Sequence, residues 1–212
     1  MASQYERELR AVLAGIPKGV EAVTRSCDTI TKARAMQVVK RPFLVVRAAG
    51  SGMEGSGDLL ALRGDICFPI EVKSSKKDKL YLSGRTKEQY DAMVREGQRC
   101  NLMPLYAYRL KGVRGDSWRI FRVDVGKLTG RLGMLVRRIP PLPLTRNGKE
   151  FLDWGQGMPL HMFLALVCRN SNSSTVNSLE ERANRLDKES SIDESLIQIK
   201  LTDKAILSKR QA

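Results

Sequence analysis

Histidine and paired cysteines, the residues that most often hold zinc in proteins, are nearly missing from this chain. Its 212 residues include a single histidine, His161, and four cysteines that stand singly at positions 27, 67, 100 and 168. This composition argues against a zinc finger or a zinc hydrolase. Because His161 lies in an apolar run, it also argues against a histidine general base or a serine-protease-like triad. We expect His161 to be a hydrogen-bonded residue of a packed helix, and the cysteines to be buried free thiols of a reducing compartment.

Long apolar runs are missing as well. The longest, from His161 to Cys168, has eight residues, whereas a membrane-spanning helix needs roughly 20. The first ten residues mix acidic with basic side chains and contain no apolar core, so they do not resemble a signal peptide. We therefore expect a cytoplasmic, nucleoid-associated protein without a membrane partner.

Basic residues outnumber acidic residues in one part of the chain only. There are 37 Lys and Arg against 23 Asp and Glu, which gives a net charge of +14 and a pI near 9.9. Such a charge attracts polyanions, either nucleic acid or an acidic membrane surface. Residues 170–212 contain seven basic and seven acidic residues, so the whole excess lies in residues 1–169. Since Asn170–Ser178 has the composition of a linker, we expect one domain over residues 1–169 and a flexible or helical tail over residues 170–212.

Hydrophobic periodicity and turn residues predict an α/β or α+β domain. Ser3 and Glu6 have the spacing of a capping box at the start of a helix over residues 4–14. Residues 15–42 are ambiguous, although a helix capped by Asp28 fits part of them. The remainder should contain a strand at 43–47, a loop at 48–57, a hairpin at 58–62 and 66–73, a helix at 86–98 and a strand pair at 102–110 and 118–123.

The predicted hairpin carries three ionisable side chains in otherwise apolar strands: Asp58, Glu71 and Lys73. Since side chains alternate along a strand, Glu71 and Lys73 project from the same face. The hairpin places the start of its first strand beside the end of its second, so Asp58 and Glu71 should converge with Lys73 next to them. Pro69, earlier in the second strand, suggests that this strand lies at an edge or carries a bulge.

Two adjacent carboxylates repel each other and resist burial unless a cation is present. Mg²⁺ and Mn²⁺ prefer such oxygen ligands, so we expect Mg²⁺ as the cofactor, with Mn²⁺ able to replace it. A metal held there can polarise a phosphate and activate water. Lys73 would steady the phosphate or the attacking hydroxide. The three residues thus predict phosphodiester hydrolysis, in agreement with the basic charge of the domain.

The same three residues also have a simpler interpretation. Two acids thirteen residues apart, followed by a lysine, occur by chance in many proteins. Taken alone, they are better explained by an edge strand with a surface Glu–Lys pair. Their spacing nevertheless matches the PD-(D/E)xK nuclease superfamily, with Gly57 where that pattern has a proline.

Neighbouring segments extend this match. The chain contains the segments Glu6-Arg7-Glu8-Leu9, Val45-Val-Arg-Ala-Ala-Gly-Ser51, Asp58-Leu-Leu-Ala61, Ile70-Glu-Val-Lys73 and Lys76-Lys-Asp-Lys-Leu-Tyr-Leu82. With them it resembles the archaeal Holliday junction resolvases, densely over residues 43–123. The resemblance implies a restriction-endonuclease-like α/β core, in which helices flank a central mixed β-sheet of about five strands. It also implies a homodimer that acts in DNA recombination and repair by placing paired nicks in a four-way DNA junction.

The resemblance further implies a role for each matching residue. The catalytic set would be Glu6, Asp58 and Glu71 as metal ligands, Lys73 as the catalytic lysine and Arg47 beside the scissile phosphate. The DNA contacts implied by the resemblance are Arg7 and Ser51.

Other basic and aromatic residues near this site are open to two interpretations. The cations that follow the second hairpin strand could contact phosphate or form a solvated turn; they are Lys76, Lys77, Lys79 and Arg85. Tyr81 and Tyr90 could stack on exposed bases, but core packing is the simpler expectation for both.

Two parts of the chain depart from the family. About twenty extra residues, an insertion near 15–38, separate the first helix from the arginine strand, which makes Glu21 an alternative to Glu6. The tail has no counterpart, and its aliphatic cluster Leu196–Leu201 could dock a sliding clamp or another recombination protein.

Three functions remain open at this point. The first is a Mg²⁺-dependent endonuclease that resolves four-way DNA junctions. The second is another nuclease of the same superfamily, acting on flaps, mismatches or linear duplex. The third is a basic DNA-binding protein without catalysis, for which Mg²⁺ and the residues Asp58, Glu71 and Lys73 would be irrelevant.

Overall fold

The structure is a computed structural model and describes residues 3–48, 57–64 and 66–168. The described residues belong to one unit that ends at Cys168. Two predictions lie outside them: the tail over residues 170–212, and most of the glycine-rich loop, including Ser51.

Three helices precede the first strand. Helix α1 (Gln4–Leu13) begins at the predicted capping box, in which Ser3 Oγ accepts from Glu6 N at 3.1 Å and Glu6 Oε1 accepts from Ser3 N at 3.1 Å. The ambiguous stretch forms two helices, α2 (Pro17–Thr24) and α3 (Thr29–Lys40). Asp28 caps the second, because its Oδ1 accepts from Thr31 N at 2.9 Å.

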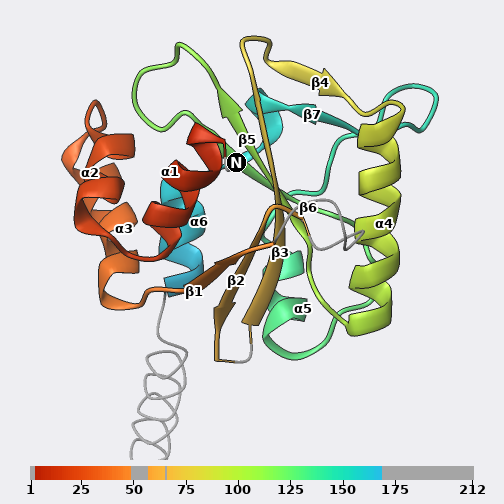
Figure 1. The fold of residues 1–212 in the computed structure, drawn as a ribbon, viewed down its shortest axis with the longest axis horizontal. Coiled ribbons are helices and arrows are strands. Elements are labelled where there is room, and N and C mark those ends of the chain that lie inside the picture. Colours follow the sequence, from red (N-terminus) through yellow and green to blue (C-terminus); the bar gives the residue numbers. More distant parts are fainter. Residues whose placement is uncertain (1–2, 49–56, 65, 169–212) are drawn as a thin grey trace, which may run out of the picture. The chain divides into compact units, whose positions relative to one another are not determined.

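A six-stranded mixed sheet forms the centre of the fold (Figure 1). Its order is β1 (Leu44–Arg47), β2 (Leu59–Arg63), β3 (Ile66–Ser75), β5 (Leu105–Leu110), β6 (Trp118–Arg122) and β8 (Met158–Pro159). All neighbours are antiparallel except β3 and β5, which are parallel and joined through helix α4 (Arg85–Cys100). The predicted α/β class is confirmed, with six strands in place of about five because the two-residue β8 extends the edge.

The sheet separates two hydrophobic clusters. On one face the apolar side chains of β2, β3 and β5 pack with α1, α3, α5 (Gly130–Val136) and α6 (Leu160–Cys168). On the other face Tyr106 and Tyr108 of β5 pack with Tyr90 and Met93 of α4. Figure 1 shows α4 on one side of the sheet and α1, α3 and α6 on the other. The helices therefore flank the sheet as predicted.

A second, two-stranded sheet pairs β4 (Lys79–Tyr81) with β7 (Phe151–Asp153), two segments far apart in the sequence. Its aromatic contact is between Tyr81 and Phe151, whose ring centroids are 5.3 Å apart. The prediction that Tyr81 packs in the core is wrong. The residue is 59% exposed, because Phe151 covers only one face of its ring. The same prediction is confirmed for Tyr90, which is buried.

Strand β3 is not an edge strand, since it lies between β2 and β5. Its pairing with β5 begins at Ile70, one residue after Pro69. The proline, which has no N–H to donate, therefore precedes the stretch in which β3 has a strand on both sides. The same strand then carries Glu71 and Lys73 into the middle of the sheet.

The remaining predictions concern single residues. His161 belongs to α6, and its Nδ1 lies 2.7 Å from Asp116 Oδ2, which confirms a satisfied histidine on a packed helix. All four cysteines are free. The prediction of a buried thiol is wrong for Cys100, which is exposed at the end of α4. Of the four cysteines, only Cys168 is fully buried.

No helix in the described part of the chain combines the length and the apolar character needed to cross a membrane.

Candidate active site

Gly57, the residue before Asp58, has a backbone conformation and a close contact that favour glycine. Its φ of +69° lies in the left-handed region, and an added Cβ would stand 2.6 Å from the Ile70 carbonyl oxygen. A proline, locked near −65°, cannot adopt this backbone, which explains the departure from the superfamily pattern at this position. The close contact with β3 continues at the next residue, Asp58, whose N–H donates to Ile70 O at 2.8 Å.

The hairpin brings Asp58, Glu71 and Lys73 together. Asp58 directly precedes β2, and its Oδ2 accepts from the backbone N–H of Val72 at 2.8 Å. On β3, Lys73 Nζ donates to Glu71 Oε1 at 2.7 Å. The alternation of side chains on β3 and the antiparallel pairing of β2 with β3 produce this convergence.

Both hairpin carboxylates are poorly solvated. Glu71 is only 5% exposed and Asp58 is half-buried. Burial raises the pKa of Asp58, and the charge of Glu6 raises it further. Burial also raises the pKa of Glu71, while Lys73 lowers it and Asp58 raises it. Burial is the main cause in both cases, so the charged form of each carboxyl group is disfavoured at this site.

Glu6 and Arg47 border this pair. Glu6 Oε2 lies 3.6 Å from Arg47 Nε, while Glu6 Oε1 is occupied by the N–H of Ser3. The charges of Glu6 and Arg47 both act on Asp58, in opposite directions. Glu21, the alternative acid, lies instead on α2 in a pocket beside α3. The structure therefore brings Glu6 toward the hairpin, although its role as a metal ligand stays a prediction.

Two residues of the site were missed from the sequence. Gln89 of α4 accepts a hydrogen bond from Lys73 Nζ through its Oε1 at 2.9 Å. Tyr106, the partner of Glu71 in the register of β3 and β5, is fully buried, and its hydroxyl has no hydrogen-bond partner among the described residues. Burial and the charge of Glu71 raise the pKa of Tyr106. The sequence marked neither residue, because Gln89 is one of many polar residues of α4 and Tyr106 lies in a largely apolar strand.

The donor set fits a hard divalent cation in part. Asp58 and Glu71 offer desolvated carboxylate oxygens, and the unpartnered Tyr106 hydroxyl is a polar group near Glu71 that a metal-bound water could satisfy. Across residues 3–48, 57–64 and 66–168, no three or more His, Cys, Asp or Glu side chains are arranged to hold a metal ion. The side chains described here therefore supply two carboxylates, and Mg²⁺ commonly keeps several waters beside one or two.

The candidate DNA contacts differ in their exposure and in whether an acid pairs with them. Arg7 is exposed on α1, Lys76 and Lys77 are exposed on the turn after β3, and Arg85 is exposed at the start of α4. Lys79 lies 3.8 Å from Asp153 of the small sheet and is therefore paired with an acid.

A family model matches part of the sequence. The sequence profile described as archaeal Holliday junction resolvase (Hjc) matches residues 33–138, half of the 212-residue chain. Among solved structures, Hjc of Archaeoglobus fulgidus, a Holliday junction resolvase from an archaeal hyperthermophile, is 22% identical. The match covers 60% of this chain and 91% of that chain, with a TM-score of 0.42. A search of the curated proteins found no match.

The matched residues include Arg47, Asp58, Glu71, Lys73 and Gln89, whereas Glu6 and Arg7 precede them. Because the profile covers half of the chain and contains the convergent hairpin, the chain belongs to the archaeal Holliday junction resolvase family.

Proposed function

We propose that this protein is a Mg²⁺-dependent endonuclease that resolves four-way DNA junctions, with paired nicks made by a homodimer. One observation carries the proposal: Asp58, Glu71 and Lys73 converge on the central hairpin of a chain that belongs to this family. A basic domain around an acidic site suits a protein that holds DNA against a metal ion.

Asp58 and Glu71 would hold the metal ion. When bound, Mg²⁺ supplies charge for the scissile phosphate and lowers the pKa of a bound water. The backbone N–H of Val72 donates to Asp58 Oδ2, and Asp58 Oδ1 takes no part in that hydrogen bond. Burial keeps both carboxylates poorly hydrated, so a divalent cation relieves more repulsion here than at a solvated pair.

Lys73 would position the reacting groups. Its ammonium has three N–H groups, of which one reaches Glu71 and another reaches Gln89. The third is available to a phosphate oxygen or to the attacking water. Two fixed partners restrict the ammonium, so little rotamer freedom is lost when DNA binds.

Arg47 would contact a non-bridging oxygen of the scissile phosphate. Its side chain lies at the end of β1, is partly exposed and is turned toward Glu6. The guanidinium stays charged at any working pH and matches phosphate geometry. Glu6 restrains it, and this arrangement is also compatible with Glu6 as a third acidic ligand once Arg47 binds DNA.

Recognition of the junction would depend on backbone phosphates and on shape. Contacts of this kind give an affinity that falls steeply with salt and little sequence preference. Two sites in one homodimer would nick two strands symmetrically, with selectivity set by the branched geometry of the DNA. Sedimentation of the protein with a junction tests the predicted two subunits per DNA.

The Asp58→Asn variant tests the proposal. Asparagine keeps an oxygen acceptor for the N–H of Val72 but removes the charge that holds the metal. The variant should bind a synthetic four-way junction with about wild-type affinity and leave it uncut. Cleavage at the wild-type rate would show that the metal site has been misassigned. Equal cutting of linear duplex by the wild type would favour a less selective nuclease, and no Mg²⁺ dependence would favour a non-catalytic DNA-binding protein.

A further inference from the structure

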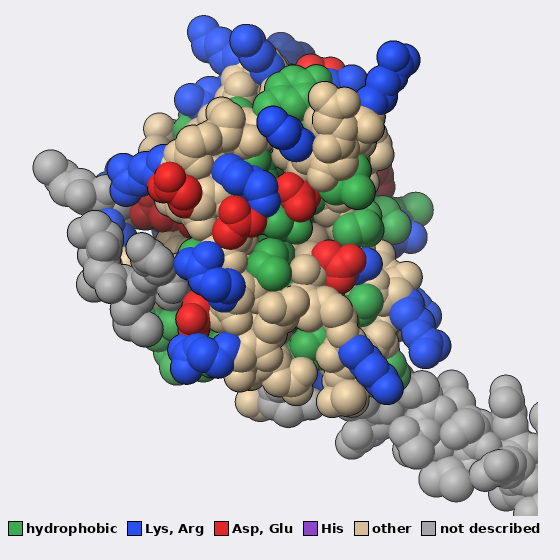
Figure 2. All heavy atoms as spheres, turned by 90° about the vertical axis from the view of Figure 1, so that its right-hand side faces the viewer, with side chains coloured by type: hydrophobic (Ala, Val, Ile, Leu, Met, Phe, Trp, Pro, Cys, Tyr) green, Lys and Arg blue, Asp and Glu red, His purple; other side chains and the backbone are tan. Residues whose placement is uncertain are grey.

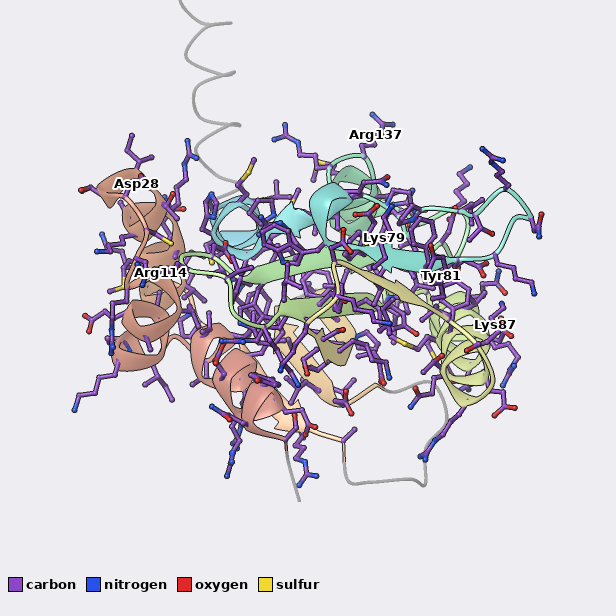
Figure 3. The ribbon with its side chains drawn as sticks, turned by 90° about the horizontal axis from the view of Figure 1, so that it is seen from above. Asp28, Lys79, Tyr81, Lys87, Arg114 and Arg137 are labelled. Carbon is purple, nitrogen blue, oxygen red and sulfur yellow. The ribbon has the colours of Figure 1, made fainter. Side chains whose placement is uncertain are left out.

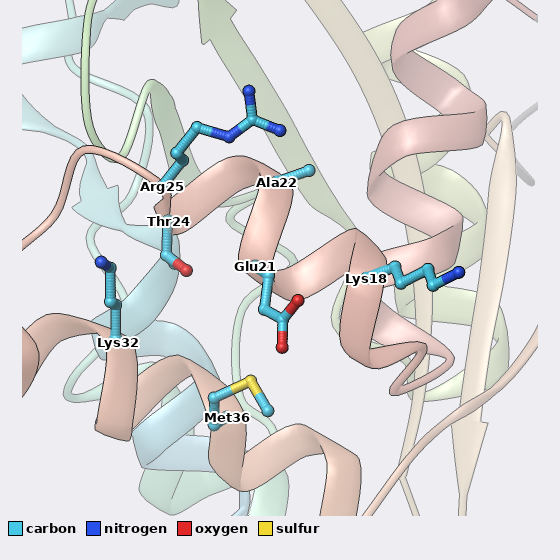
Figure 4. A pocket seen from close by; sticks show the side chains of 7 residues that line it. All are labelled: Lys18, Glu21, Ala22, Thr24, Arg25, Lys32 and Met36. Atoms are coloured by element: carbon cyan, nitrogen blue, oxygen red, sulfur yellow. The ribbon is translucent and has the colours of Figure 1, made fainter.

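A basic pocket lies between α2 and α3, and its charged lining residues precede the segment matched by the family profile (Figure 4). Its volume is about 610 Å³, and its charged lining residues are Lys18, Arg25, Lys32 and Glu21. All four precede residue 33, where the match begins. Figure 4 shows the side chains of Arg25 and Lys18 extending from α2 and that of Lys32 from α3.

The three cations of this pocket have no acidic partner in the part of the chain that the structure describes. Lys18, Arg25 and Lys32 are exposed, and none forms a hydrogen bond or ion pair through its side chain with a described residue. The nearby acid Asp28 is committed to its own helix, since it accepts from Thr31 N at 2.9 Å and from Thr31 Oγ1 at 2.7 Å. The pocket thus keeps a net positive charge that attracts anions.

Some cations on the surface around α4 have acidic partners. Figure 2 views this face, on which acidic and basic side chains are interspersed. Lys87 lies 3.4 Å from Glu150 and also contacts Asp91, and Arg99 contacts Glu96. Among the described residues the pocket cations lack such pairs, a property that they share with other exposed cations such as Arg85 and Arg137; what distinguishes them is that all three line one pocket.

The loop between β5 and β6 connects the pocket with the catalytic strand. At its start, Lys111 N donates to Ser75 O at the end of β3 at 2.8 Å. At its far side, a Cβ on Gly115 would lie 3.7 Å from Cys27 Sγ, in the turn between α2 and α3. Lys111 and Arg114 of this loop are exposed, and Figure 3 places Arg114 beside these helices. A series of cations therefore leads from β3 to the pocket.

We propose that the α2–α3 pocket binds the phosphate backbone of a junction arm away from the scissile phosphate. This inference rests on the proposed function, because it assumes DNA held at the hairpin site. Backbone phosphates are the ligand that the lining favours: it offers three cations but no aromatic side chain on which a base could stack. The pocket would extend the footprint on DNA without adding sequence preference.

The test compares two triple variants of the full chain. One carries Lys18→Gln, Arg25→Gln and Lys32→Gln. The control carries Lys127→Gln, Arg137→Gln and Arg138→Gln, which removes the same charge from exposed positions that flank α5. Binding is measured without metal on a junction whose arms are about 20 base pairs, roughly 70 Å at 3.4 Å per base pair. Log affinity against log salt should become shallower by about 2 to 3 in the pocket variant, since each lost phosphate contact removes about 0.9. The control should keep the wild-type slope.

A second measurement locates the contact. Short runs of uncharged methylphosphonate linkages replace phosphates at successive places along one arm. At one place the run should lower the DNA affinity of the wild type about tenfold and that of the pocket variant only slightly, because the phosphate and the pocket cations are coupled partners. Equal slopes in the two triple variants, or an equal cost of every run in wild type and pocket variant, would overturn the proposal. Cleavage of the unmodified junction by the wild type with Mg²⁺ reports the proposed function separately. If the methylphosphonate run and the pocket substitutions are coupled but the junction stays uncut, the proposed nuclease function alone is overturned. If the junction is cut but no coupling is found, the proposed role of the pocket alone is overturned.

Discussion

The ammonium of Lys73 lies 2.9 Å from the amide oxygen of Gln89, a contact that ties the central strand β3 to helix α4. The same ammonium lies 2.7 Å from Glu71. One side chain thus joins a candidate metal ligand to the helix on that face of the sheet, and the position of the lysine depends on both partners.

Removal of Gln89 should slow cleavage without weakening DNA binding. In Gln89→Leu the ammonium of Lys73 loses one of its two fixed partners, a charge-assisted hydrogen bond worth about 1.5–3 kcal/mol. We expect kcat to fall about tenfold, with an unchanged KM for the junction. Glu88→Ala, an exposed change on the same helical turn, is the matched control. A wild-type kcat in Gln89→Leu would show that α4 does not position the lysine.

Replacement of Lys73 itself should be far more severe. Lys73→Gln removes the charge that most lowers the pKa of Glu71, so that this pKa should rise further and metal binding should weaken. We expect a loss of about 10²–10⁴ in rate. Lys73→Arg should not restore activity, because the planar guanidinium cannot occupy the place of a compact ammonium between Glu71 and Gln89. Single-turnover cleavage at saturating protein, over a range of Mg²⁺ concentrations, separates the two effects.

The metal-free protein should gain stability from Asp58→Asn. Burial raises the pKa of Asp58 above its ordinary value of 3.8, so the folded state favours the protonated carboxyl. Below that ordinary pKa the charge is absent and the variant should match the wild type. As the pH rises through the folded-state pKa, the wild type acquires a desolvated charge and becomes the less stable protein. Melting curves in EDTA from about pH 4 to pH 8 should therefore diverge by a few degrees toward high pH.

Addition of Mg²⁺ should reverse that order. The ion stabilises the folded wild type by mass action, because it binds the folded state alone. Asp58→Asn lacks the ligand charge and should show little change in melting temperature. A variant that is less stable than the wild type in EDTA at neutral pH would contradict the desolvated site.

Gly57→Ala should disrupt the site more than the same change in the hairpin turn. Both Gly57 and Gly64 have positive φ, but a Cβ at Gly64 meets nothing within 4 Å, while at Gly57 it meets Ile70 O at 2.6 Å. Gly64→Ala should cost about 1–2 kcal/mol, the ordinary penalty of a left-handed residue. Gly57→Ala should cost clearly more and should also slow cleavage, because Asp58 is the next residue. Equal melting temperatures would show that the close approach is not required.

Much of this architecture could be predicted from the sequence because its signals are local. Three features depend on residues only a few positions apart. They are the capping box of Ser3 and Glu6, the shared strand face of Glu71 and Lys73, and the turn at Gly64. The convergence of Asp58 with Glu71 follows from one hairpin. These features survive because no distant contact opposes them.

The features that were missed depend on contacts between distant segments. The pairing of β4 with β7 joins Lys79 to Asp153, and no local pattern marks either partner. Gln89 reaches Lys73 only because the crossover helix packs against that face. Pro69 marks an edge only for the first part of β3, because the pairing with β5 begins at Ile70, and no local pattern shows where that pairing begins. The exposed ring of Tyr81 likewise depends on which face Phe151 covers.

We expect the Asp58–Glu71 hairpin to cut branched DNA. The test uses a four-way junction labelled in turn on each of its strands. The junction is incubated with the wild-type protein with and without Mg²⁺, beside a linear duplex of the same length. The expected products are symmetric nicks in two opposing strands of the junction, formed only with Mg²⁺, and an intact duplex. Uncut junctions in Mg²⁺, or a duplex cut as fast as the junction, would contradict it.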